Sequence, residues 1–227
     1  MFRTRILAAS AVAGAAALGA TAMAVSEDDG EVRDLAAPSR PATAPTELPV
    51  PAGWRVADTR TENHDDTPVT VTRYERDGRR TLGAEHVSTV VARDGTLLGY
   101  TRMIAGASGD LLPEERAREA ALGWLRRHAP EYARGLDVQW VDRHDERVRT
   151  PDGREHVVPG MKVKARHESG LYAWVIVDGT GRVVTYERDV RWDSSAGRRG
   201  TEMWMHDSWV AAREGTGPQP AAPYAVA

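Results

Sequence analysis

Short runs rich in β-branched residues, separated by Asp-Gly turns, constrain this chain most strongly, because they predict an antiparallel sheet. The runs over 84–92 and 96–104 flank the turn Arg93-Asp94-Gly95. Two β-rich runs around an Asp-Gly predict a hairpin. Residues 201–210 fit either a strand or a short helix. Further strands are predicted from the remaining β-rich runs, at 69–74, 138–141, 157–165, 171–177 and 182–192.

The most regular helical pattern lies between these runs. Pro113, Glu114 and Glu115 occupy its first turn, where proline and acidic residues are favoured. Apolar residues then recur at helical spacing as far as His128, and Pro130 ends the helix. We therefore predict an α+β fold, in which one main amphipathic helix packs on an antiparallel β-sheet.

One pattern occurs twice, as glycine-x-leucine/valine-leucine/valine-x-tyrosine-x-arginine over 95–102 and again over 181–188. This repetition indicates two related hairpin units around the helix. The alternative is that any hairpin with a glycine turn shows a similar pattern. Both interpretations stay open at the level of sequence.

Three segments together resemble the PepSY-type and YcdB/YcdC-repeat secreted domains, namely 95–102, 112–127 and 171–188. They carry, in order, a hairpin ending in G-x-L-L-x-Y, a helix opening with L-P-E-E, and a strand containing Y-x-W-V-I-V. The chain departs from that family in lacking many repeats and in its Trp-rich end. The resemblance implies a helix packed on an antiparallel sheet and a role like that of propeptide inhibitors or cell-envelope accessory proteins. It implies no catalytic motif.

The first 24 residues have the parts of a secretory signal peptide. Arg3 and Arg5 precede an apolar run over 6–20, and Ala22-Met23-Ala24 fits the small-x-small cleavage pattern. The alternative is an uncleaved anchor, because an apolar stretch of this length can just cross a bilayer. We expect cleavage, secretion, and no stable membrane span afterwards.

Composition divides the remainder into three parts. Residues 25–53 are rich in proline and alanine and predict a disordered linker, whereas 54–213 contain the predicted folded domain. Residues 214–227 are again rich in proline and predict a disordered C-terminal tail.

The net charge limits the possible partners, and the absence of cysteine limits how the fold is stabilised. The formal net charge is −3, and it becomes −5 when Arg3 and Arg5 leave with the signal peptide. Binding to nucleic acid or to anionic membranes requires clustered, uncompensated Lys and Arg, so we expect neither. The chain has no cysteine, so its stability must come from a packed core.

Motifs that carry catalysis or metal binding are missing from the sequence. Ser108 lies between Gly106 and Gly109 without the spacing of a nucleophile elbow. Several histidines stand beside an acid, but no His-x-x-x-His pair occurs. We therefore predict no catalytic residue, no metal site and no cofactor.

The Trp-rich stretch over 192–209 is the most unusual part of the chain. Trp and Arg dominate binding hot spots, and Trp rings also stack on sugars. The candidate partner-binding residues are Trp192, Arg198, Arg199, Trp204, His206 and Asp207. The alternative is that these tryptophans are core residues, because the chain beyond the signal peptide has no phenylalanine.

These observations favour a secreted, non-enzymatic module that binds an extracytoplasmic protein or a cell-envelope component. A related hypothesis is an inhibitory domain that uses 26–53 as a flexible arm. A second class is an extracellular hydrolase of cell-wall or other polymers, with Glu187, Asp189, His206 and Asp207 as its acids and histidine. That hypothesis requires a carboxylate with a raised pKa in a cleft.

Overall fold

The computed structural model describes residues 48–106 and 110–227, which belong to one compact unit spanning Arg40–Ala227. The predicted signal peptide over 1–24, most of the predicted linker and Ser108 lie outside the described residues.

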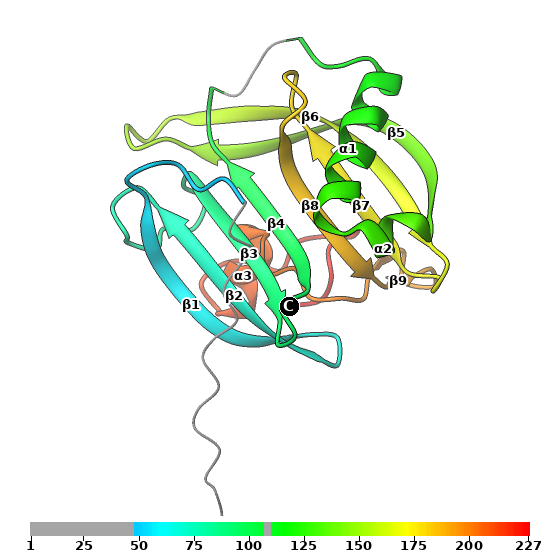
Figure 1. Ribbon diagram of the computed structural model, residues 1–227. Helices are drawn as coiled ribbons and strands as arrows, with labels where there is room; N and C mark the ends of the chain where they lie inside the picture. The colour runs from blue at the N-terminus through cyan, green and yellow to red at the C-terminus, as the bar shows by residue number, and fades with distance from the viewer. Residues whose placement is uncertain (1–47, 107–109) are drawn as a thin grey trace, which may run out of the picture. The chain divides into compact units, whose positions relative to one another are not determined.

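The core of the fold is one eight-stranded sheet whose neighbouring strands are all antiparallel (Figure 1). Its order, β1-β2-β3-β4-β8-β7-β6-β5, is that of two four-stranded meanders that meet where β4 pairs with β8. The two segments with the shared sequence pattern are therefore neighbours, with Tyr100 paired to Tyr186. The strands are β1 (Arg55–His64), β2 (Thr67–Glu75), β3 (His86–Ala92), β4 (Leu97–Met103), β5 (Leu136–Arg149), β6 (Glu155–His167), β7 (Tyr172–Val177) and β8 (Val183–Val190).

Aspartate side chains fix the turns between the strands. In the turn after β7, the Asp178 carboxylate accepts hydrogen bonds from the backbone N–H groups of Thr180 and Arg182, at 2.8 and 3.0 Å. Gly181 has a φ of 81°, which costs glycine little. The Asp94 carboxylate accepts from the Thr96 N–H in the same way before β4. The contact at Asp94 explains why the Asp-Gly pattern predicted the hairpin of β3 and β4 correctly.

Helices cover part of one sheet face. The helix α1 (Glu114–His128) buries Ala117, Ala121, Trp124 and Leu125, and the short helix α2 (Pro130–Arg134) follows it directly. The Trp124 ring lies 4.9 Å from the Tyr186 ring. Small alanines on the buried stripe, Ala117 and Ala121, let this helix pack close to the strands.

The opposite face is covered by residues 191–227, which we call the C-terminal segment. This segment contains the strand pair β9 (Trp192–Asp193) and β10 (Arg198–Arg199) and the helix α3 (Asp207–Arg213). Trp204 and Trp209 meet edge to face at 4.9 Å and pack on Val71 of β2 and Val90 of β3. The ambiguous stretch over 201–210 is thus a loop that leads into a helix.

The predicted fold class, an antiparallel sheet with one main helix packed on it, is wrong. Of the described residues 45% lie in strands and 15% in three short helices, so the fold is mostly β. The discrepancy comes from β1 and β5, the two edge strands, which extend to Arg55–His64 and Leu136–Arg149. Their charged, largely exposed residues lack the alternation by which half-buried strands are identified.

The chain ends also differ from the prediction. Residues 214–227 were predicted to be disordered, yet Ala225 is only 2% exposed and Pro223 O accepts a hydrogen bond from the Arg199 N–H at 2.9 Å. Leu48, in the predicted linker, is buried in the α1 side of the core. Both segments pack through backbone contacts and single apolar side chains, which proline-rich composition does not exclude.

The packing of α3 yields a first prediction. Because the Trp209 side chain is 1% exposed, Trp209→Ala should lower the free energy of unfolding by about 3–5 kcal/mol. Urea denaturation followed by circular dichroism measures the change. Val226→Ala, at a residue that is 66% exposed, is the control and should change stability by less than about 0.5 kcal/mol. A small effect of Trp209→Ala would show that the segment does not form part of the core.

Candidate functional site

A cavity of about 320 Å³ lies between strands β5–β7 and the C-terminal segment. We call it the aromatic cavity, since three indole rings and one phenol ring line it. It forms on the sheet face opposite α1. Its lining residues are Trp140, His144 and Glu146 from β5, Lys162 and Lys164 from β6, Trp174 and Ile176 from β7, and Trp192, Arg199, Met203, His206, Pro223 and Tyr224 from the C-terminal segment.

A buried charge cluster, centred on Glu187 of β8, lies beside this cavity. The Glu187 carboxylate accepts hydrogen bonds from Trp174 Nε1 at 3.0 Å and from His206 Nε2 at 2.9 Å, and it is ion-paired with Arg199. Glu187 and Arg199 are 2% and 3% exposed. Burial alone would raise the pKa of Glu187, but the charges of Arg199 and His206 and their hydrogen bonds outweigh it and hold the pKa well below its usual range.

The two lysines of the cavity lie over aromatic rings. Lys162 Nζ is 4.0 Å from the centre of the Trp174 ring, and Lys164 Nζ is 4.4 Å from Tyr172 and 5.5 Å from Trp192. Burial lowers the pKa of Lys162 to about 8, although Glu187 and Glu146 partly offset it. Within the described ranges, neither ammonium group lies within 4.0 Å of a carboxylate oxygen.

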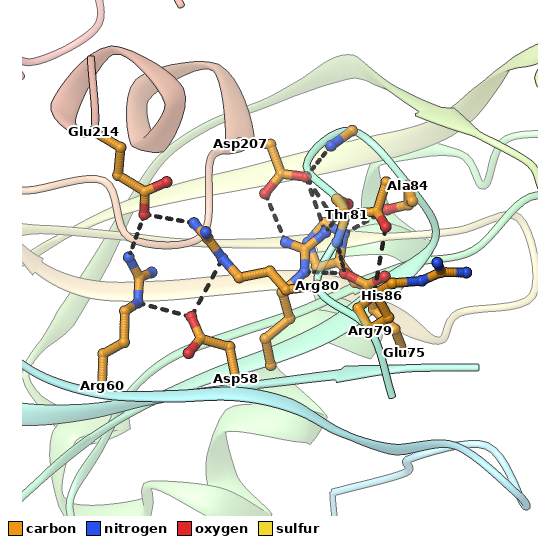
Figure 2. A network of polar contacts seen from close by, with 12 residues as sticks. Asp58, Arg60, Glu75, Arg79, Arg80, Thr81, Ala84, His86, Asp207 and Glu214 are labelled. Carbon is orange, nitrogen blue, oxygen red and sulfur yellow. Dashed lines mark hydrogen bonds and ion pairs between the residues drawn. The ribbon is translucent and has the colours of Figure 1, made fainter. Parts of the chain in front are cut away.

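A second polar network fixes the start of α3, and Asp207 is at its centre (Figure 2). Arg73 of β2 donates to both Asp207 carboxylate oxygens, at 2.6 and 3.1 Å, and to Glu75 at 2.6 Å. The Gly83 N–H donates to the same Asp207 carboxylate at 2.5 Å. Since His206 precedes Asp207, this network helps to place the His206 ring beside Glu187.

The adjoining cavity, of about 410 Å³, shares Glu146, His206 and Tyr224 with the aromatic cavity. His86 lines it and is 3% exposed. Its Nδ1 bonds to Ala84 O at 2.8 Å, whereas its Nε2 has no partner among the described residues. The two cavities therefore meet at the His206 and Tyr224 side chains.

The structure separates the predicted partner-binding residues. Trp192, Arg199 and His206 line the aromatic cavity. Trp204 is 7% exposed, and its Nε1 donates to Asn63 O at 2.7 Å on the other half of the sheet. Arg198 pairs in the β9–β10 ribbon, and Asp207 belongs to the Arg73 network.

Of the four residues proposed for a hydrolase, the structure brings together Glu187 and His206. Asp207 is bound to Arg73 instead, and Asp189 accepts a hydrogen bond from Arg188 at 2.8 Å. The residues that sequence reasoning missed are Trp140, His144, Glu146, Lys162, Lys164 and Trp174. One signal for them was present, since Lys162 and Lys164 are the only lysines in the chain and occur at strand spacing.

Comparison with models of known protein families, with curated proteins and with solved structures found no match. In the part of the chain that the structure describes, no three or more His, Asp or Glu residues are grouped so as to hold a metal ion. No helix there has the length and apolar character needed to cross a membrane.

The Glu187–Arg199 pair gives a second prediction. Glu187→Gln removes one charge of a buried pair and leaves the Arg199 guanidinium uncompensated, so it should lower the free energy of unfolding by about 3 kcal/mol at neutral pH. Urea denaturation measures the change against Glu119→Gln, whose exposed carboxylate pairs with Arg116 on α1. Equal stabilities of the two variants would contradict the claim that Glu187 and Arg199 form a buried, stabilising ion pair.

His86 gives a third prediction. Burial lowers its pKa to about 4, with Asp207 opposing and Arg73 adding to the shift. The unfolded chain therefore binds a proton at this residue at higher pH than the folded chain, and stability is lost as the pH falls below about 6.5. As the pH falls from about 7 to about 5, protonation of His86 in the unfolded chain should lower the free energy of unfolding by roughly 2 kcal/mol. In His86→Gln this part of the pH dependence should disappear, and an unchanged slope would contradict a neutral buried imidazole.

Proposed function

We propose that this chain is an exported, non-catalytic binding module that holds part of a cell-envelope glycan in the aromatic cavity. The observation that carries the proposal is the set of indole rings from Trp140, Trp174 and Trp192 in one cavity. Trp140 is 42% exposed although its side chain is large and apolar. Indole rings offer a broad apolar face and a polar N–H to a sugar ring. Trp140 and Trp192 are the rings proposed to do so, because the Trp174 N–H already donates to Glu187 and Lys162 lies over the Trp174 ring.

The shape of the site favours a ring-sized ligand over a folded partner. Small-ligand sites are concave, with aromatic walls and a few placed polar groups, whereas protein interfaces bury broad surfaces. The aromatic cavity has a volume of about 320 Å³ and contains Arg199, His144 and His206 among its polar groups. The expected signal peptide places the module where envelope polymers occur.

The charge states of the buried carboxylates favour binding over hydrolysis. A glycosidase needs one carboxylic acid with a raised pKa as its proton donor. Burial would raise the pKa of Glu146 and Asp207, but hydrogen bonds and nearby cationic groups lower both. The pKa of Glu187 is lowered as well. These three groups are suited to holding positive partners in place rather than to donating protons.

Binding to purified peptidoglycan sacculi tests this proposal. The purified chain should co-sediment with sacculi, and Trp140→Ala or Trp192→Ala should weaken binding about tenfold or more, because each removes an aromatic wall. Trp54→Ala, outside the cavity, is the matched control and should bind as the unmodified chain does. Circular dichroism confirms that each variant is folded. Absence of binding, or equal binding by all three variants, would overturn the proposal.

A further inference from the structure

We propose that Lys162 and Lys164 form an oxyanion-recognition pair, which binds a carboxylate or phosphate substituent on the glycan held in the aromatic cavity. This inference rests on the proposed function and names the group that the site selects. A carboxylate and a phosphate both present negatively charged oxygen atoms, so the same pair of amines can bind either group.

The distribution of lysine in the chain favours an anionic ligand. Lys162 and Lys164 are the only lysines, and the remaining 28 of the 30 basic residues are arginine. Both lie on β6 two residues apart, so their side chains share the sheet face that forms the cavity. A lysine ammonium is a compact point charge that meets an oxyanion from any direction, whereas arginine presents a flat fork.

The charge balance of the cavity also favours an anionic ligand. Arg199 is committed to Glu187 and also donates to Glu202 O at 2.8 Å. His144 Nε2 lies 3.1 Å from Glu146 Oε1, so that carboxylate is also engaged. Among the described residues, the two lysines are the cationic groups of this cavity that lack an ion-pair partner within 4.0 Å. Glu187 and Glu146 act on Lys162 only from beyond ion-pair distance, so an anion in direct contact with these partly desolvated cations still adds a favourable interaction.

The position of the amines relative to the rings also favours an anionic substituent on the sugar. Lys162 Nζ lies over Trp174, and Lys164 Nζ lies 4.4 Å from the ring centre of Tyr172, 5.5 Å from that of Trp192 and 5.6 Å from that of Trp140. Contact with the rings holds both ammonium groups at the aromatic wall before a ligand binds. A sugar ring against an indole would therefore carry its anionic substituent into reach of the amines. With a pKa of about 8, Lys162 is mostly charged at neutral pH.

The test uses three preparations of the same sacculi with the unmodified chain. One is native, one has its carboxylates converted to methylamides, and one has been stripped of phosphate-bearing polymers. We expect one of the two treatments to weaken co-sedimentation at least about tenfold, since a lost charge contact of 1.4 kcal/mol has that effect. The treatment that does so identifies carboxylate or phosphate as the bound group.

Lysine variants complete the test. Lys162→Met and Lys164→Met should bind native sacculi about as weakly as the unmodified chain binds the sacculi that have lost the recognised anionic group. Removing that group should then change the binding of these variants little. Lys164→Arg keeps the charge and should retain most binding. Arg126→Met removes an exposed charge from α1, on the opposite sheet face, and should have no effect.

The possible results distinguish a failure of oxyanion recognition by the lysines from a failure of the proposed glycan-binding function. Equal binding to all three preparations, with binding still lost in Trp192→Ala, overturns the oxyanion inference and leaves the binding function standing. Absence of binding to every preparation overturns the function, and the inference falls with it. The comparison among preparations needs no variant, so it decides the question even if a lysine variant does not fold.

Discussion

The buried ion pair between Glu187 and Arg199 joins the sheet to the C-terminal segment, the two parts of the fold that enclose the aromatic cavity. Glu187 belongs to β8, next to the centre of the sheet, while Arg199 belongs to the C-terminal segment that crosses the sheet. Because both groups are almost fully buried, neither can exchange its partner for water without a large cost. Trp174 and His206 both donate to Oε1 of this carboxylate, which fixes their positions beside it.

This arrangement explains why the aromatic cavity forms where it does. The C-terminal segment packs through Trp204 and Trp209 over β2 and β3, but over β5–β7 it stands away from the strands. Charged contacts, in addition to apolar ones, hold the segment here. Glu187 fixes Arg199, which lines the aromatic cavity, and Arg73 fixes Asp207, which lines the adjoining cavity. For the proposed ligand, fixed polar groups and aromatic walls would lower the cost of ordering the site on binding.

Local chemistry made the turns and α1 predictable from sequence, whereas long-range packing did not. Asp94 and Asp178 act within a few residues, so their turns can be identified without a structure. The edge strand β5 was largely missed because its charged residues face solvent. The cavity could not be predicted for a different reason, since Trp140, Lys162 and Trp192 come together only once the sheet order is known. Trp192, Arg199 and His206, which line the cavity, were among the sequence candidates because Trp and Arg concentrate in one stretch, whereas Trp204 in the same stretch is a core residue.

Native-state hydrogen exchange at the Arg199 and Val210 amides tests most directly whether the C-terminal segment is docked on the sheet. In the structure these amides donate to Pro223 O at 2.9 Å and to His206 O at 3.0 Å. If the buried charge cluster holds the segment in place, both amides should exchange nearly as slowly as those of β4 and β8, the central strands, whose amides we expect to exchange most slowly. Exchange as fast as in an unfolded peptide would show that the segment leaves the sheet readily, and the aromatic cavity would then lose one of its walls.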